Sequence, residues 1–215
     1  MGIISDWVNR QRHNRGYGVQ SPSEFFFVTQ VLKEHLPYYA YAYLETIAEE
    51  EKCNKKHLKD LFRITNHHGP SNCIAIGSAP AACAISTARP SVEKYCITDH
   101  AINKETSEIL AHYNCKALEG KTTELLEAAL KELGGVGMVY IGKCNEYAEL
   151  LETALRYTNG KSIIVIEGIR RNKEVQEWWK SIIESTETVV TYDLHSYGLL
   201  YFNRERRKQH YTLKR

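Results

Sequence analysis

The sequence predicts one α/β domain built on a Rossmann-type, mostly parallel sheet. From residue 72 onward, short apolar runs of strand length alternate with runs that repeat with helical periodicity. Such alternation implies right-handed strand–helix–strand crossovers, which place successive strands in parallel. The run at 162–166 is almost entirely apolar, which is typical of a central strand covered on both faces. The 215 residues suffice for one such domain.

Residues 1–70 predict an N-terminal helical extension, and residues 71–215 predict the Rossmann-like core. A short helix is expected at 6–12, before a turn-rich break. Ser21 and Pro22 are typical of a helix start, because serine caps the first turn and proline suits the first helical position. We expect the extension and the core to form a single domain.

Within the core, the order of the elements predicts the sheet. The expected strands lie at 73–76, 94–98, 116–118, 138–141 and 162–166. The expected helices lie at 81–88, 103–113, 123–133, 147–157 and 174–184. Two alternating runs at 188–194 and 198–202 predict an antiparallel hairpin. The result is a mostly parallel, seven-stranded sheet with a C-terminal antiparallel hairpin.

Composition and charge argue against several classes of protein. The formal net charge is +2, so no strong overall field favours nucleic acid or a membrane surface. The longest apolar runs have strand length and are too short to span a bilayer. The first residues lack the apolar segment of a secretory signal. None of the six cysteines forms a CxxC pair, so we expect a protein of the reducing cytoplasm.

Ligands of an open parallel sheet bind beyond the carboxyl ends of its strands. The turn after the first expected strand contains Gly77, Ser78 and Ala79, whose small side chains let the backbone approach a nucleotide. Asp99 follows the second strand about 20 residues later, where a carboxylate can accept hydrogen bonds from ribose hydroxyls. Two alternatives stay open: the turn serves only close helix packing, and Asp99 only caps the next helix.

The turns after the fourth and fifth strands supply the other candidates. Gly142 begins the turn after the fourth strand, in which Cys144 has no histidine nearby in sequence to activate it. Glu167 leaves the buried fifth strand at its carboxyl end and is a candidate functional carboxylate. An ion pair of Glu167 with Arg170 or Arg171 would explain the same residue without catalysis.

Several distinctive segments follow one another along nearly the whole chain. They are Gly18-Val19-Gln20-Ser21-Pro22, Phe62-Arg63, Glu167-Gly168-Ile169, Trp178 or Trp179, the hairpin at 193–198, and Gln209-His210-Tyr211. In this order they resemble a family of bacterial O-methyltransferase-like proteins with the class I S-adenosylmethionine-dependent methyltransferase fold. The chain is similar to a divergent member of that family.

The resemblance implies a methyltransferase that uses S-adenosylmethionine and methylates an oxygen atom of a small molecule. The implied cofactor-binding residues are Gly77, Ser78, Ala79, Asp99 and Gly142. The candidate catalytic residues are Glu167 and His100, and Tyr197 is a further candidate base. Methyl transfer in this class depends largely on positioning, and a base or a metal supplies the rest.

The chain departs from the family where related enzymes carry acidic residues. The tripeptide Ala75-Ile76-Gly77 stands in place of Glu-Leu-Gly, and Gly142 stands in place of aspartate. Glu167 is followed by Gly168, where a second acid is usual. A divalent metal needs several oxygen ligands, so we expect no metal. A catalytically inactive binding or interaction protein is therefore the first alternative.

A nucleic-acid methyltransferase or binder is the second alternative, because the chain is basic at 10–15 and at 204–215. Acidic residues elsewhere balance these stretches, which favours solvated ends and a small-molecule substrate. Aromatic residues in the N-terminal helices would suit contact with a second copy, so a homodimer is a further expectation.

Overall fold

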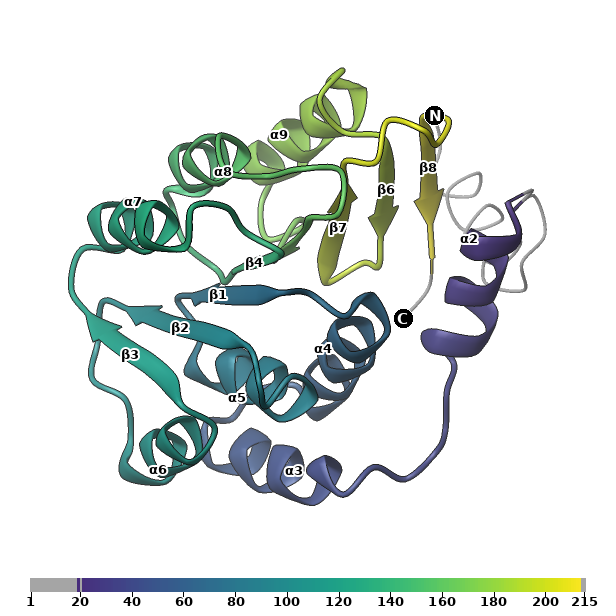
Figure 1. The fold of residues 1–215 in the computed structure, drawn as a ribbon. Coiled ribbons are helices and arrows are strands. Elements are labelled where there is room, and N and C mark those ends of the chain that lie inside the picture. The colour runs from purple at the N-terminus through teal and green to yellow at the C-terminus, as the bar shows by residue number, and fades with distance from the viewer. Residues whose placement is uncertain (1–18, 20, 214–215) are drawn as a thin grey trace.

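Eight strands form one sheet in the order β3-β2-β1-β4-β5-β7-β6-β8 (Figure 1). The computed structural model describes residue 19 and residues 21–213. The strands are β1 (Asn72–Ile76), β2 (Glu93–Thr98), β3 (Cys115–Glu119), β4 (Met138–Ile141), β5 (Ile163–Glu167), β6 (Val190–Asp193), β7 (Tyr197–Tyr201) and β8 (Gln209–Thr212). The helices are α2 (Pro22–Phe26), η1 (Phe27–Val31), α3 (Ala40–Glu50), α4 (Lys55–His68), α5 (Ala79–Ala88), α6 (Lys104–His112), α7 (Thr122–Leu133), α8 (Tyr147–Leu155) and α9 (Lys173–Glu184).

The pairing of the strands confirms the predicted fold class. The first five strands along the chain pair only in parallel with one another, through helical crossovers. The expected hairpin is formed by β6 and β7, and β7 lies antiparallel between β5 and β6. The sheet is therefore mostly parallel, with an antiparallel C-terminal part.

The structure corrects the expected number of strands from seven to eight. The segment Gln209–Thr212 pairs in parallel with β6, and Val190 lies opposite Gln209. The basic stretch at 204–215 predicts a solvated end, but Tyr211 and Leu213 are buried. Only four residues alternate here, among charged neighbours, so the local pattern is too short to predict a strand.

Helices cover both faces of the sheet (Figure 1). One face packs against α3, α4 and α5, and the other face packs against α7, α8 and α9. Successive side chains of a strand point to opposite faces, so one strand contributes to two cores. In β4, Tyr140 belongs to the core under the N-terminal helices, and Val139 and Ile141 belong to the other core.

The two ends of α4 have clear local causes. The Asn54 side chain caps the first turn by accepting hydrogen bonds from the N–H groups of Lys56 and His57, at 2.9 and 3.3 Å. Gly69 ends the helix in the left-handed region, with φ of 64°. Between these ends, α4 packs against α5 and brings Nε2 of His57 to the Tyr140 hydroxyl.

The helix expected to start at Pro22 is observed as α2, which continues into η1. The expected helix at 6–12 and the basic stretch at 10–15 lie outside the described residues. Within the described part of the chain, every helix is too short or too polar to traverse a lipid bilayer.

Replacing Gly198 with alanine should destabilise the fold. A Cβ atom at this position in β7 would lie 2.3 Å from Cη2 of the buried Trp179 ring on α9. Overpacking of this kind costs about 1–3 kcal/mol in the free energy of unfolding, measured by urea denaturation. Gly160→Ala is the control, because its Cβ would meet nothing closer than 3.8 Å. Equal stability of the two variants would contradict the packing described.

Candidate functional site

The carboxyl ends of β2, β1, β4 and β5 lie next to one another along one edge of the sheet. Ile76 at the end of β1 lies opposite Ile97 of β2 and opposite Ile141 of β4. Ile141 in turn lies opposite Ile166 of β5. The four loops that follow these strands therefore start side by side, and each begins near a residue that the sequence analysis selected.

The turn between β1 and α5 leaves room beside its glycine. Gly77 has φ of 70°, and its N–H donates to the Ile97 carbonyl at 2.8 Å. A Cβ at Gly77 would approach nothing nearer than Cα of Gly142, at 4.0 Å. Ser78 caps α5, because its Oγ accepts from the Ala81 N–H at 3.3 Å. The amino terminus of α5 thus faces the sheet edge with its partial positive charge.

Gly142 is required by the close approach of two backbone segments. Its N–H donates to the Ile76 carbonyl at 2.8 Å. A Cβ at Gly142 would lie 2.9 Å from the Ile76 oxygen and 3.0 Å from the Gly77 oxygen. Any side chain here, a carboxylate included, would force the β1–α5 turn away.

Asp99 follows β2, and its side chain is 75% exposed. Its Oδ1 accepts a hydrogen bond from Nδ1 of His100 at 2.7 Å, and this bond holds the pKa of Asp99 below its ordinary value. Asp99 does not cap α6, because that role belongs to Asn103, whose Oδ1 accepts from the Thr106 N–H at 2.7 Å. The capping alternative for Asp99 is therefore not realised.

The loop between β4 and α8 lies within electrostatic range of Asp99. Burial raises the pKa of the Cys144 thiol to about 11, and the negative charge of Asp99 adds to the shift. Such a thiol is protonated at neutral pH, which agrees with the absence of a nucleophilic role for Cys144.

Glu167 ends β5 with its side chain only 20% exposed. The Tyr140 hydroxyl donates to its Oε2 at 2.7 Å, and Nζ of Lys143 lies 3.3 Å from its Oε1. The ion pair that the sequence left open thus exists, but with Lys143 rather than with Arg170 or Arg171. Those two arginines instead contact Asp193 and Asn145, respectively.

His57 is the site residue that sequence reasoning missed. Its Nε2 lies 3.0 Å from the Tyr140 hydroxyl, and its side chain is buried on α4. The apolar stripe of that helix identifies a packed face, but it carries no signal that a histidine on that face meets β4. Burial lowers the pKa of His57, which keeps its ring neutral.

The backbone at Gly168 excludes a second acid after Glu167. Gly168 has φ of 77°, and a Cβ there would lie 2.9 Å from the Tyr147 hydroxyl and 3.0 Å from Cγ of Lys143. The same Tyr147 hydroxyl donates to the Glu167 carbonyl at 2.5 Å, which holds this turn against α8. The packing of this turn therefore leaves no room for a second acidic side chain at position 168.

The two candidate catalytic residues do not lie together. The strands that carry His100 and Glu167 are separated by β1 and β4, so three strand spacings, about 14 Å, lie between their ends. His100 contacts Asp99, whereas Glu167 contacts Tyr140 and Lys143. Tyr197 donates its hydroxyl to Asp60 at 2.9 Å, deep in the core beneath α4.

The donor set at this edge does not fit a divalent metal ion. Glu167 offers one carboxylate, and the ammonium group of Lys143 lies beside its outer oxygen. Within the described residues, no cluster of three or more histidine, cysteine, aspartate or glutamate side chains could hold a metal. A cation in contact with Glu167 would be repelled by Lys143.

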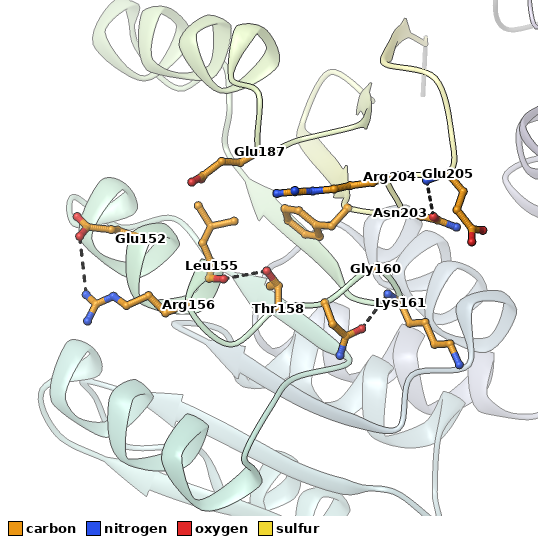
Figure 2. A pocket seen from close by; sticks show the side chains of 12 residues that line it. Glu152, Leu155, Arg156, Thr158, Gly160, Lys161, Glu187, Asn203, Arg204 and Glu205 are labelled. Atoms are coloured by element: carbon orange, nitrogen blue, oxygen red, sulfur yellow. Dashed lines mark hydrogen bonds and ion pairs between the residues drawn. The ribbon is translucent and has the colours of Figure 1, made fainter.

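A cavity of about 1050 Å³ opens at the other edge of the sheet, between the α8–β5 and β7–β8 loops. Figure 2 shows its lining, in which Arg156 pairs with Glu152 and the Thr158 hydroxyl donates to the Leu155 carbonyl. This cavity is remote from the four loops described above, because it lies where β5 begins rather than where it ends.

Comparison with known proteins identifies the architecture. No family model matches the sequence, and no curated protein matches it. Among solved structures, the O-methyltransferase TomG from Streptomyces achromogenes, in complex with S-adenosylmethionine, superposes with a TM-score of 0.61 at 12% identity, over 83% of this chain and 94% of that one. The chain has the fold of class I O-methyltransferases.

Two further structures support the same assignment of the fold. The O-methyltransferase from Bacillus cereus, bound to S-adenosylhomocysteine, has a TM-score of 0.59 at 11% identity, over 79% of this chain and 93% of that one. The Podospora anserina methyltransferase PaMTH1, also bound to S-adenosylhomocysteine, has a TM-score of 0.55 at 14% identity, over 93% and 95%. At these identities the likeness concerns the fold.

The buried, neutral His57 should make the fold sensitive to acid. In the unfolded chain this histidine protonates near pH 6.5, whereas burial lowers its pKa in the folded protein. Its contribution to stability is thus present above about pH 6.5 and is lost as the pH falls below it.

We expect His57→Gln to reduce the pH dependence of the free energy of unfolding by up to about 1.4 kcal/mol per pH unit. Urea denaturation between pH 7 and pH 5 measures it, and His35→Gln, at an exposed histidine, is the control. A pH dependence that His57→Gln leaves intact would contradict the assignment.

Proposed function

We propose that this protein is an S-adenosylmethionine-dependent methyltransferase that methylates a hydroxyl group of a small molecule. The observation that carries the proposal is the shared sheet edge, along which an open glycine turn, the exposed carboxylate of Asp99 and the largely buried carboxylate of Glu167 follow neighbouring strands. The fold adds support, because TomG and the Bacillus cereus enzyme were solved with S-adenosylmethionine and S-adenosylhomocysteine.

The residues around the first two loops fit an adenosyl cofactor. The space beside Gly77 would admit the ligand close to the backbone, and Ser78 and Ala79 are small enough to border it. Asp99 would accept hydrogen bonds from the ribose hydroxyls, and His100 would hold that carboxylate in place through their existing bond. Gly142 would keep the turn in its open shape.

We propose Glu167 as the general base. When bound, S-adenosylmethionine supplies an electrophilic methyl group whose carbon–sulfur bond breaks with its electron pair left on sulfur. The acceptor oxygen uses a lone pair to form the new carbon–oxygen bond, and its hydroxyl proton passes to Glu167. Glu167 then returns that proton to solvent. Alignment of the acceptor with the methyl group would supply much of the rate.

Lys143 would take over part of the electrostatic role that a metal has in other enzymes. Its ammonium group lies beside Oε1 of Glu167 and is 60% exposed, so it would also face a bound acceptor oxygen. A positive charge there stabilises the negative charge that develops as the hydroxyl loses its proton. We therefore propose a metal-independent reaction.

The state of the cysteines is consistent with a reducing compartment such as the cytoplasm. All six are free thiols, and four of them are buried. A homodimer through the aromatic N-terminal helices stays a prediction, in which the half-exposed Phe25 and Phe26 would take part.

Replacing Asp99 with alanine should weaken cofactor binding without unfolding the protein. Loss of hydrogen bonds to an ionised group costs about 1.5–3 kcal/mol, which is roughly 10- to 100-fold in Kd. Titration calorimetry with S-adenosylhomocysteine measures the effect. Glu187→Ala, at the opposite sheet edge, is the control. No binding by the wild-type protein at millimolar ligand would refute the proposed function, and equal affinity of both variants would refute the role of Asp99.

Replacing Glu167 with glutamine should abolish most of the turnover but leave the cofactor affinity unchanged. Removal of a general base lowers kcat by about 10²- to 10⁴-fold. Release of S-adenosylhomocysteine, with an acceptor selected from a panel of phenols and alcohols, measures turnover, and Glu205→Gln is the control at the far edge. Cofactor binding without turnover of any acceptor by the wild type would instead support the inactive binding protein.

A further inference from the structure

A buried row of hydrogen-bonding groups lies behind Glu167. The Tyr140 hydroxyl, on β4, is fully buried and contacts Oε2 of Glu167 at 2.7 Å. On its other side it contacts Nε2 of His57 at 3.0 Å. His57 belongs to the N-terminal helical extension, and 83 residues separate it from Tyr140 in the sequence. The extension therefore reaches the back of the proposed active site.

The Tyr140 hydroxyl determines which group donates and which group accepts in each hydrogen bond of this row. A phenolic hydroxyl has one proton to donate. Because Tyr140 donates that proton to Oε2 of Glu167, it can only accept from the other neighbour. Nε2 of His57 must then carry a proton and donate it to Tyr140.

The surroundings of His57 also favour a hydrogen bond that Nε2 of His57 donates to Tyr140. Burial keeps the ring neutral, so only one of its two nitrogens carries a proton. Nδ1 is buried and has no hydrogen-bond partner among the described residues. A buried N–H without an acceptor is costlier than a bare ring nitrogen, so the proton belongs on Nε2, where an acceptor exists.

We propose that His57 and Tyr140 form a positioning pair that holds Glu167 ionised and directs its Oε1 toward the methyl acceptor. The inference rests on the proposed function, because it assigns a supporting role to the proposed base. Hydrogen bonds to the charged form of a carboxylate favour that form. Oε2 is occupied by Tyr140, so Oε1, beside Lys143, is the oxygen that receives the acceptor's proton.

Other groups also face this carboxylate and set the background for any titration. The groups around Glu167 are Tyr140 on β4, Lys143 after β4, Tyr147 on α8, Cys53 before α4 and His57 on α4. Asp60, also on α4, acts on His57. The ammonium group of Lys143 lies beside Oε1, on the side away from Tyr140. Tyr140 is the group in this set whose hydroxyl contacts Glu167 from the buried side.

A variant of Tyr140 tests the pair without any ligand. Tyr140→Phe removes one hydroxyl and keeps the ring, so we expect it to raise the pH at which half of Glu167 is protonated by about one unit, a tenfold change in the ionisation equilibrium. Difference infrared spectroscopy of the ¹³C-glutamate-labelled protein, with Glu167→Gln as the reference, follows this carboxylate.

Tyr192→Phe is the matched control, because Tyr192 is equally buried and its hydroxyl also bonds a carboxylate, that of Glu24. It should leave the Glu167 titration unchanged. A purely structural role of Tyr140 would give the two variants the same titration, and that result would overturn the proposal.

The protonation of His57 provides a second, independent measurement. Two-bond ¹H–¹⁵N correlation spectra distinguish the two ring nitrogens, and His57→Gln assigns the signal. We expect a neutral ring protonated on Nε2. A ring protonated on Nδ1 would mean that Tyr140 donates to His57 rather than to Glu167, and it would overturn the proposal.

The pH dependence of kcat in two variants of His57 tests the pair during turnover. His57→Gln places an amide N–H near the position of Nε2–H, whereas His57→Leu removes the donor. We expect the acidic limb of the kcat profile to shift to higher pH in His57→Leu and to return toward the wild type in His57→Gln.

Failure of cofactor binding would refute the methyltransferase. The infrared and NMR measurements on the protein alone would still decide whether the pair holds Glu167 ionised.

Discussion

The parallel pairing of β4 with both β1 and β5 is the constraint on which the site depends. Parallel strands end at the same edge, so this register aligns Ile76, Ile141 and Ile166 and makes their three loops neighbours. The glycine after β4 then packs against the turn after β1, and Lys143 reaches the carboxylate after β5. A shift of register by one residue would reverse the direction of every side chain and separate these groups.

The buried polar groups behind that edge need hydrogen-bond partners, because an unpaired polar group in the core costs free energy. Tyr140 and Tyr197 both point into the core covered by α4, and both find partners there. The Tyr197 hydroxyl bonds Asp60, which pairs with Arg63. The helical extension is therefore more than a cover for apolar surface, since it supplies hydrogen-bond partners to the buried tyrosines of β4 and β7.

The glycines at 142 and 168 give the departures from the family pattern a physical meaning. Each stands where a carboxylate would be expected, and each is packed so closely that a side chain would collide with its neighbours. Lys143 brings a positive charge to the remaining acid, Glu167. The altered residues thus form one consistent arrangement rather than isolated losses.

Local patterns in the sequence were sufficient to predict the α/β class and the order of the elements. They also predicted the turns that carry Gly77, Asp99, Gly142 and Glu167. Periodicity and turn chemistry act over a few residues, and the ends of parallel strands necessarily meet. The partner of Glu167, the contact of His57 with Tyr140 and the strand β8 came only from the folded chain. Each depends on contacts between segments far apart in sequence, such as the 83 residues between His57 and Tyr140, and packing that joins distant segments leaves no local period to detect.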